Sequence, residues 1–173
     1  KLLLMATAGL LAFASCQDKA GYTIKGTIEG VAEGDTVYLQ DFVDGGLVKM
    51  DSAVVKGGAF EFKGTPDSVT VSRYVTYMKN GQRMTAMVFI EKGDISLNMS
   101  AKSNKVSGTT CNNAYQQFMD KFVALNQEMS DLYQKAQSDT TLTEDQRKDL
   151  EKQLAEKDSL GTEMVYNLSL IHI

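Results

Sequence analysis

The chain has 173 residues, a length typical of one domain with a short appendage. Hydrophobic residues make up 43% and charged residues 23% of the chain, which is ordinary for a globular protein. The formal net charge of −4 excludes the basic surface that binds nucleic acid phosphates. A single His and two Cys, Cys16 and Cys111, exclude a histidine-rich metal site, a CxxC redox pair and a four-ligand zinc site. We therefore expect neither a catalytic residue nor a metal or cofactor in this chain.

Residues 2–15 form an uncharged run of apolar and small side chains. As a helix this run would span about 21 Å, which is shorter than the roughly 30 Å hydrocarbon core of a bilayer. Its length and composition are therefore typical of the apolar part of a signal peptide rather than of a transmembrane helix. We expect residues 1–15 to be a signal peptide that is truncated at its start.

The run ends in small residues directly before Cys16, and this pattern resembles the lipobox of bacterial lipoproteins, although Phe13 replaces the usual leucine. The resemblance implies that Cys16 is lipidated and that residues 16–20 are the acylated cysteine and its polar tether. The membrane is then a partner through the lipid on Cys16, because two or more acyl chains suffice for stable anchoring. The expected location is the bacterial cell envelope, on the periplasmic side or at the outer membrane. The alternative is a plain secretory signal with an incidental cysteine.

Residues 21–110 alternate apolar and polar side chains with a period of two, which is the pattern of half-buried strands. Gly57-Gly58 and Asn80-Gly81 are hairpin signals between such runs. About seven short strands are expected, at residues 22–29, 35–42, 47–55, 60–63, 68–78, 85–90 and 95–99. The pattern predicts an antiparallel β-sandwich or a barrel-like domain.

Residues 112–167 change to the helical period of 3.6. We expect a first helix of about 24 residues with Asn112 or Asn113 as its N-cap, and a second helix that begins with a capping box of Thr143 and Gln146. The two helices would form a hairpin or linker, so the chain is mainly β with an α-helical hairpin, α+β overall. The apolar stripe of the first helix should pack partly on the second helix and partly on the β domain; alternatively, it docks on a domain that follows. This stripe consists of Tyr115, Phe118, Phe122, Met129 and Leu132.

The last six residues, 168–173, read Leu-Ser-Leu-Ile-His-Ile. This hexapeptide is the translation, in one frame, of a transposon adapter used in sequencing libraries, so we interpret it as adapter read-through. His172 is then not native, and the protein continues beyond Asn167. The alternative is a native apolar tail.

Five segments in one order carry a resemblance over about residues 20–115. They are 22–30 (YTIKGTIEG), 35–39 (DTVYL), 50–64 (MDSAVVKGGAFEFKG), 89–95 (FIEKGDI) and 106–112 (VSGTTCN). Together they resemble the domain-of-unknown-function family numbered 4369. In that family the β domain usually follows a lipoprotein signal and is often joined, through a helical stretch, to a thioredoxin-like domain with a WCxxC motif. The resemblance implies a thiol–disulfide oxidoreductase as the parent protein, but this chain has no WCxxC, so no catalytic residue is carried over.

Two hypotheses for the function follow. In the first, the chain is the non-catalytic anchoring and spacer part of an envelope lipoprotein whose thioredoxin-like catalytic domain comes later in the parent chain. In the second, it is a stand-alone, non-enzymatic lipoprotein whose β domain binds a protein or glycan at the cell envelope. Cys111 is interpreted as an inert thiol in both, because no cationic residue flanks it to lower its pKa.

The lipobox pattern predicts that Cys16 is acylated. Expressed with a complete native signal in a bacterial host, the protein should incorporate labelled palmitate, and Cys16→Ser should abolish the labelling. An unlabelled and fully soluble wild-type protein would contradict this prediction.

Overall fold

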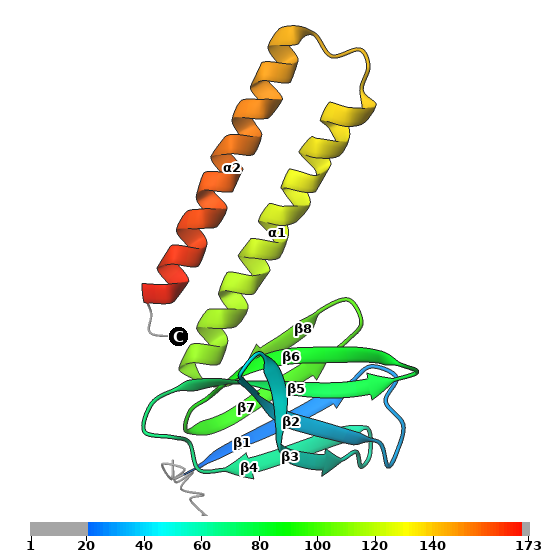
Figure 1. The fold of residues 1–173 in the computed structure, drawn as a ribbon, viewed down its shortest axis with the longest axis vertical. Coiled ribbons are helices and arrows are strands. Elements are labelled where there is room, and N and C mark those ends of the chain that lie inside the picture. Colours follow the sequence, from blue (N-terminus) through cyan, green and yellow to red (C-terminus); the bar gives the residue numbers. More distant parts are fainter. Residues whose placement is uncertain (1–20, 171–173) are drawn as a thin grey trace, which may run out of the picture.

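The computed structural model describes residues 21–170, which form eight strands followed by two long helices (Figure 1). The strands are β1 (Tyr22–Ile28), β2 (Thr36–Val43), β3 (Gly46–Val54), β4 (Ala59–Gly64), β5 (Val71–Lys79), β6 (Gln82–Ile90), β7 (Gly93–Met99) and β8 (Asn104–Ser107). The helices are α1 (Thr110–Ser138) and α2 (Glu144–Leu170). The signal peptide, Cys16 and its tether, and His172 lie outside the described residues.

The strands form two four-stranded sheets, in the orders β4-β1-β7-β8 and β3-β2-β5-β6. This confirms the predicted sandwich. One pairing differs from the antiparallel expectation, because β1 runs parallel to β7 while it pairs antiparallel with β4. Strand β8 was not predicted, because this four-residue edge strand contains only one buried residue, Val106, and so shows no alternation of apolar and polar residues.

The core lies between the two sheets and is built from the alternate residues of each strand. In β1, for example, Ile24, Gly26 and Ile28 face inwards while Lys25 and Thr27 are exposed. The buried hydrophobic cluster consists of Ile24, Ile28, Val37, Leu39, Val55, Phe60, Phe62, Val75, Tyr77, Ala86, Val88, Ile90, Ile95, Leu97, Met99 and Val106. Residues 21–170 thus contain a complete two-sheet core, which is what a self-standing folding unit requires.

Two glycine–aromatic pairs lock the register of β1 against β4. Gly26 is opposite Phe60, and Tyr22 is opposite Gly64. A Cβ atom on Gly26 would lie 2.1 Å from Cζ of Phe60, and one on Gly64 would lie 2.6 Å from the hydroxyl oxygen of Tyr22. Each aromatic ring therefore covers the glycine of the facing strand, an arrangement that any larger residue would disrupt.

The two helices begin in different ways. The N-cap of α1 is Thr109, so the prediction of Asn112 or Asn113 is wrong, and the helix is five residues longer than expected, at 29 residues. The predicted capping box at the start of α2 is confirmed. The Thr143 backbone N–H donates a hydrogen bond to Gln146 Oε1 at 2.9 Å. In return, the Gln146 backbone N–H donates to Thr143 Oγ1 at 3.3 Å.

The helices pack as an antiparallel hairpin with a narrow apolar seam. On α1 the seam residues alternate spacings of four and three, as in a coiled coil: Phe118, Phe122, Leu125, Met129, Leu132 and Ala136. Only Leu125 and, on α2, Leu150 are buried in it. Gly161 of α2 lies opposite Leu125: a Cβ atom added at Gly161 would be 3.5 Å from Leu125 Cδ2. Gly161 itself has no side chain with which to fill the seam there.

The first helix also contacts β6 and β8, which confirms that its apolar stripe packs on both the second helix and the β domain. Tyr115 packs against the core, and its ring meets that of Phe89 edge-on with centroids 5.4 Å apart. Within the described part of the chain, neither helix has the length and hydropathy needed to span a bilayer.

Truncating the seam should destabilise the protein in proportion to its burial. Phe122 is half-buried and stacks on Phe118 with ring centroids 5.4 Å apart. Because a fully buried Phe→Ala change costs about 3–5 kcal/mol, Phe122→Ala should lower the free energy of unfolding by about 1–2 kcal/mol. The neighbouring Val123 is 60% exposed, so Val123→Ala is the matched control and should change it by less than about 0.5 kcal/mol. Urea melts measure both; coincident midpoints for wild type and Phe122→Ala would show that Phe122 contributes no packing.

Candidate functional site

A buried asparagine joins the helical hairpin to the sandwich. Asn112, in the first turn of α1, is 0% exposed. Its Oδ1 accepts a hydrogen bond from the Phe89 backbone N–H at 2.9 Å, and its Nδ2 donates to the Phe89 carbonyl at 2.7 Å. The amide therefore bonds to β6 as a neighbouring strand would. Nδ2 also donates to Thr109 Oγ1 at 2.7 Å, which uses the second hydrogen of the amide.

A carboxylate from the sandwich caps the same helix. Glu91 Oε1, just after β6, accepts hydrogen bonds from the backbone N–H groups of Cys111 at 2.7 Å and Asn112 at 3.4 Å. Thr109 makes no side-chain cap bond, so Glu91 supplies what an N-cap residue normally provides. A negative charge at this position also interacts favourably with the helix dipole.

The connection between β8 and α1 is equally constrained. Gly108 has φ of 108°, a conformation that favours glycine, and a Cβ atom there would lie 2.1 Å from the Asp94 carbonyl oxygen. In the second turn of α1, the Gln116 side chain accepts a hydrogen bond from the Val106 backbone N–H at 2.7 Å. Bonds on both sides of the connection fix the direction in which α1 leaves the sandwich.

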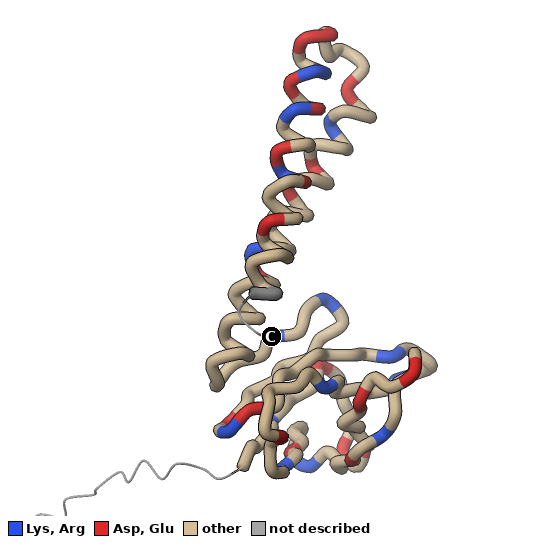
Figure 2. The backbone as a smooth tube through the Cα atoms, turned by 60° about the vertical axis from the view of Figure 1, so that its left-hand side comes forward, with Lys and Arg blue, Asp and Glu red and all other residues tan. Residues whose placement is uncertain are grey.

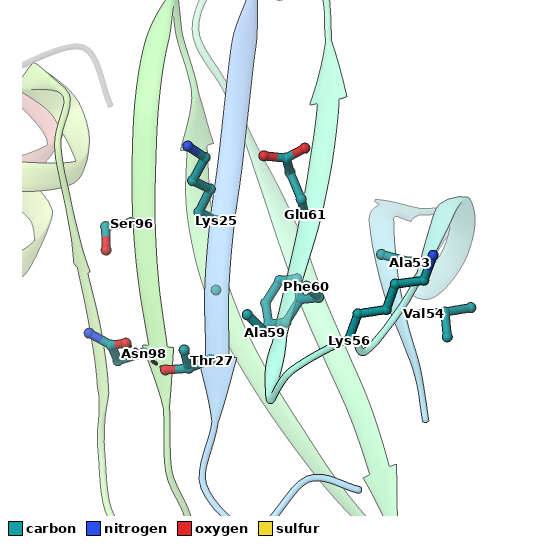
Figure 3. A pocket seen from close by; sticks show the side chains of 11 residues that line it. Lys25, Thr27, Ala53, Val54, Lys56, Ala59, Phe60, Glu61, Ser96 and Asn98 are labelled. Atoms are coloured by element: carbon teal, nitrogen blue, oxygen red, sulfur yellow. Dashed lines mark hydrogen bonds between the residues drawn. The ribbon is translucent and has the colours of Figure 1, made fainter. Parts of the chain in front are cut away.

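The outer face of the β4-β1-β7 sheet carries a polar hollow of about 670 Å³ (Figure 3). Across its floor, the Thr27 hydroxyl donates a hydrogen bond to Asn98 Oδ1 at 2.7 Å. The other polar side chains that line it are those of Lys25, Lys56, Glu61 and Ser96. The alternation that buries the core residues of these strands turns these side chains outwards.

The hollow offers hydrogen-bond donors, acceptors and charges of both signs, but no nucleophile beside a general base. Among residues 21–170, no group of three or more His, Cys, Asp and Glu residues is placed to hold a metal ion. The side chains that line the hollow can form hydrogen bonds and ion pairs with a polar group.

Cys111 lies at the joint and not in the hollow. Burial, and then the nearby Glu91 carboxylate, raise the pKa of its thiol above the ordinary value. A reactive cysteine needs the opposite shift, because the thiolate is the nucleophile. This environment agrees with the interpretation of Cys111 as an inert thiol. The candidate lipidation residue, Cys16, lies outside the described residues, so its assignment stays a prediction.

Comparison with known proteins places the chain in a family. The profile of the family described as Domain of unknown function (DUF4369) matches residues 22–115, more than half of the chain. The chain therefore belongs to this family, as the sequence resemblance predicted. The match covers the whole sandwich and the first turn of α1, so the joint at Asn112 falls within it.

No curated protein matches the chain. Among solved structures, the chain is similar to a Bacteroides ovatus protein described as a "putative cell adhesion protein", with 10% sequence identity and a TM-score of 0.33. That match covers 54% of this chain and 44% of the other, so the chain spans less than half of the protein it resembles.

The joint yields a direct prediction. Asn112→Ala leaves the Phe89 backbone groups buried without partners, and each such group costs about 1–3 kcal/mol. We expect a loss of about 2–4 kcal/mol in the free energy of unfolding and faster hydrogen exchange at the Phe89 amide. Asn113, which is exposed and accepts one bond from the Gly108 N–H, is the control: Asn113→Ala should cost about 1 kcal/mol or less. Equal losses for the two variants, measured in urea, would contradict the role of Asn112.

Proposed function

We propose that this chain is the non-catalytic front part of an envelope lipoprotein: a spacer, lipid-anchored through Cys16, that holds a following thioredoxin-like domain at a fixed place. The parent protein would be a thiol–disulfide oxidoreductase. Membership of the DUF4369 family supports the proposal through the resemblance described above.

The observation that carries the proposal is where the chain enters and leaves the described structure. The Gly93 backbone N–H donates to the Gly21 carbonyl at 3.1 Å, and Gly93 also lies beside Thr109, the N-cap of α1. The described chain thus begins next to the base of the hairpin. Helix α2 then runs back along α1 towards that base (Figure 1). Asn167, near the end of α2, lines a groove together with Ala114 of α1.

The base of the hairpin has a surface suited to a neighbouring domain. Residues 110–119 and 164–167 contain no charged side chain, whereas charges line the rest of both helices (Figure 2). Val165 and Tyr166 are 51% and 62% exposed there. An uncharged, partly apolar surface beside the end of α2 is what a domain following α2 would cover.

The polar hollow favours a second candidate function, that of a stand-alone lipoprotein that binds a protein or glycan on its outer sheet. The native gene sequence after Asn167 separates the two. A WCxxC motif within about 100 residues, one domain length, supports the spacer function, and a stop codon soon after Asn167 supports the second candidate.

The spacer function also predicts that residues 20–167 alone have no disulfide reductase activity. This part of the chain has one thiol, Cys111, and one thiol cannot complete a dithiol–disulfide cycle. Insulin reduction should equal the buffer blank for the wild-type fragment and for Cys111→Ser. Turnover that persists in Cys111→Ser would contradict the assignment as a non-catalytic part.

A further inference from the structure

A second cleft, of about 560 Å³, opens where α1 diverges from the edge strand β8. We call it the β8–α1 cleft. Its floor includes Leu97 and Val106, which are core residues of the sandwich. Its walls are the side chains of Met87 from β6 and of Tyr115, Met119, Val123 and Ala124 from α1. The lining therefore continues the apolar core outwards, and its volume is within the range of small-molecule sites.

Helix α1 carries a separate apolar stripe towards this cleft. Tyr115, Met119 and Val123 follow one another at spacings of four, so they lie on one helix face, and this face is not the one that packs on α2. Tyr115 reaches the core, Met119 is half-buried, and Val123 is 60% exposed. The stripe thus runs from the sandwich out to the mouth of the cleft.

The mouth of the cleft is polar and more positive than negative. Lys105 pairs with Asp120 at 2.5 Å, and Gln116 Nε2 donates to the same carboxylate at 2.7 Å. These contacts lower the pKa of Asp120, so its charge offsets that of Lys105 at neutral pH. Lys102, also at the mouth, adds a second ammonium group without a second carboxylate in the lining.

We propose that the β8–α1 cleft binds a single-chain anionic amphiphile, such as a fatty acid, with its hydrocarbon chain along the Tyr115–Met119–Val123 face and its carboxylate beside Lys102. Both halves of such a ligand have a complementary surface: an apolar lining for the chain and an excess positive charge for the head group. The polar hollow lies on the outer face of the same sheet, over β4, β1 and β7, and charged side chains of both signs, Lys25, Lys56 and Glu61, line it beside its apolar residues. This proposal is independent of the spacer function.

The test is calorimetric titration of residues 21–170 with dodecanoate up to about 1 mM, a range that detects weak binding. We expect saturable 1:1 binding that is at least tenfold weaker in Val123→Glu, which places a carboxylate on the chain path, and several-fold weaker in Lys102→Glu. Val165→Glu is the matched control, because Val165 is a helical valine of similar exposure, 51%, outside the cleft lining. Its affinity should equal that of the wild type, and thermal melts confirm that each variant is folded.

Two further ligands separate the contributions of head group and chain. Dodecyltrimethylammonium, with the same chain and a positive head, should bind more weakly than dodecanoate, and acetate should not bind measurably. The proposal is overturned by absence of dodecanoate binding, by equal loss in Val165→Glu and Val123→Glu, or by equal affinity for the cationic amphiphile. Binding to anionic phospholipid vesicles without binding of dodecanoate would also overturn it, because the cleft would then not be the site.

Discussion

The orientation of the helical hairpin depends on one buried side-chain amide. Leu125 and Leu150 are the buried residues of the narrow hairpin seam, and the hairpin contacts the sandwich through the first turns of α1. On the edge strand β6, the Asn112 side chain forms the backbone hydrogen bonds of Phe89 that a further strand would otherwise form. On the edge strand β8, the Gln116 side chain does this for the Val106 backbone N–H. One helical turn thus satisfies backbone groups at the edges of both sheets, and in doing so it fixes the angle at which α1 leaves.

The other two sheet edges are protected without a helix. Strand β3 has a register shift opposite Leu39 and Gln40, and the Asp51 carboxylate accepts a hydrogen bond from the Ser52 backbone N–H at 2.7 Å. Both features interrupt the regular edge that another strand would need for pairing. Strand β4 is short and carries a Lys63–Glu61 ion pair at 2.5 Å. The sandwich therefore offers no uninterrupted, uncharged edge for strand addition, which leaves its faces and the helical joint for recognition.

The elements were predictable wherever local chemistry decides the outcome. Period-two alternation, the β-forming composition of residues 68–78 and the turn signals together predicted seven of the strands, and the capping box of Thr143 and Gln146 located the start of α2. These signals all lie within a few residues in sequence. The joint was not predictable in this way. Asparagine is a common N-cap residue, but the side-chain amide of Asn112 bonds instead to the backbone of Phe89, 23 residues away in sequence. The helix is capped by Glu91, which comes from a different loop. Likewise, the two clefts are formed by strands and a helix distant in sequence, so no local pattern marks them.

The joint and the β8–α1 cleft share the same structural parts. Val106 is both a bonding partner of Gln116 and part of the cleft floor, and Lys105 reaches across the mouth to Asp120 on α1. A small change in the angle of α1 would therefore alter the width of the cleft, and an occupant would favour the angles at which its contacts are best. Because α1 and α2 are long, a small rotation of α1 at Asn112 would move the turn at the far end of the hairpin by a large distance. Rigidity at the joint is thus the condition under which the hairpin can hold anything else in a defined position.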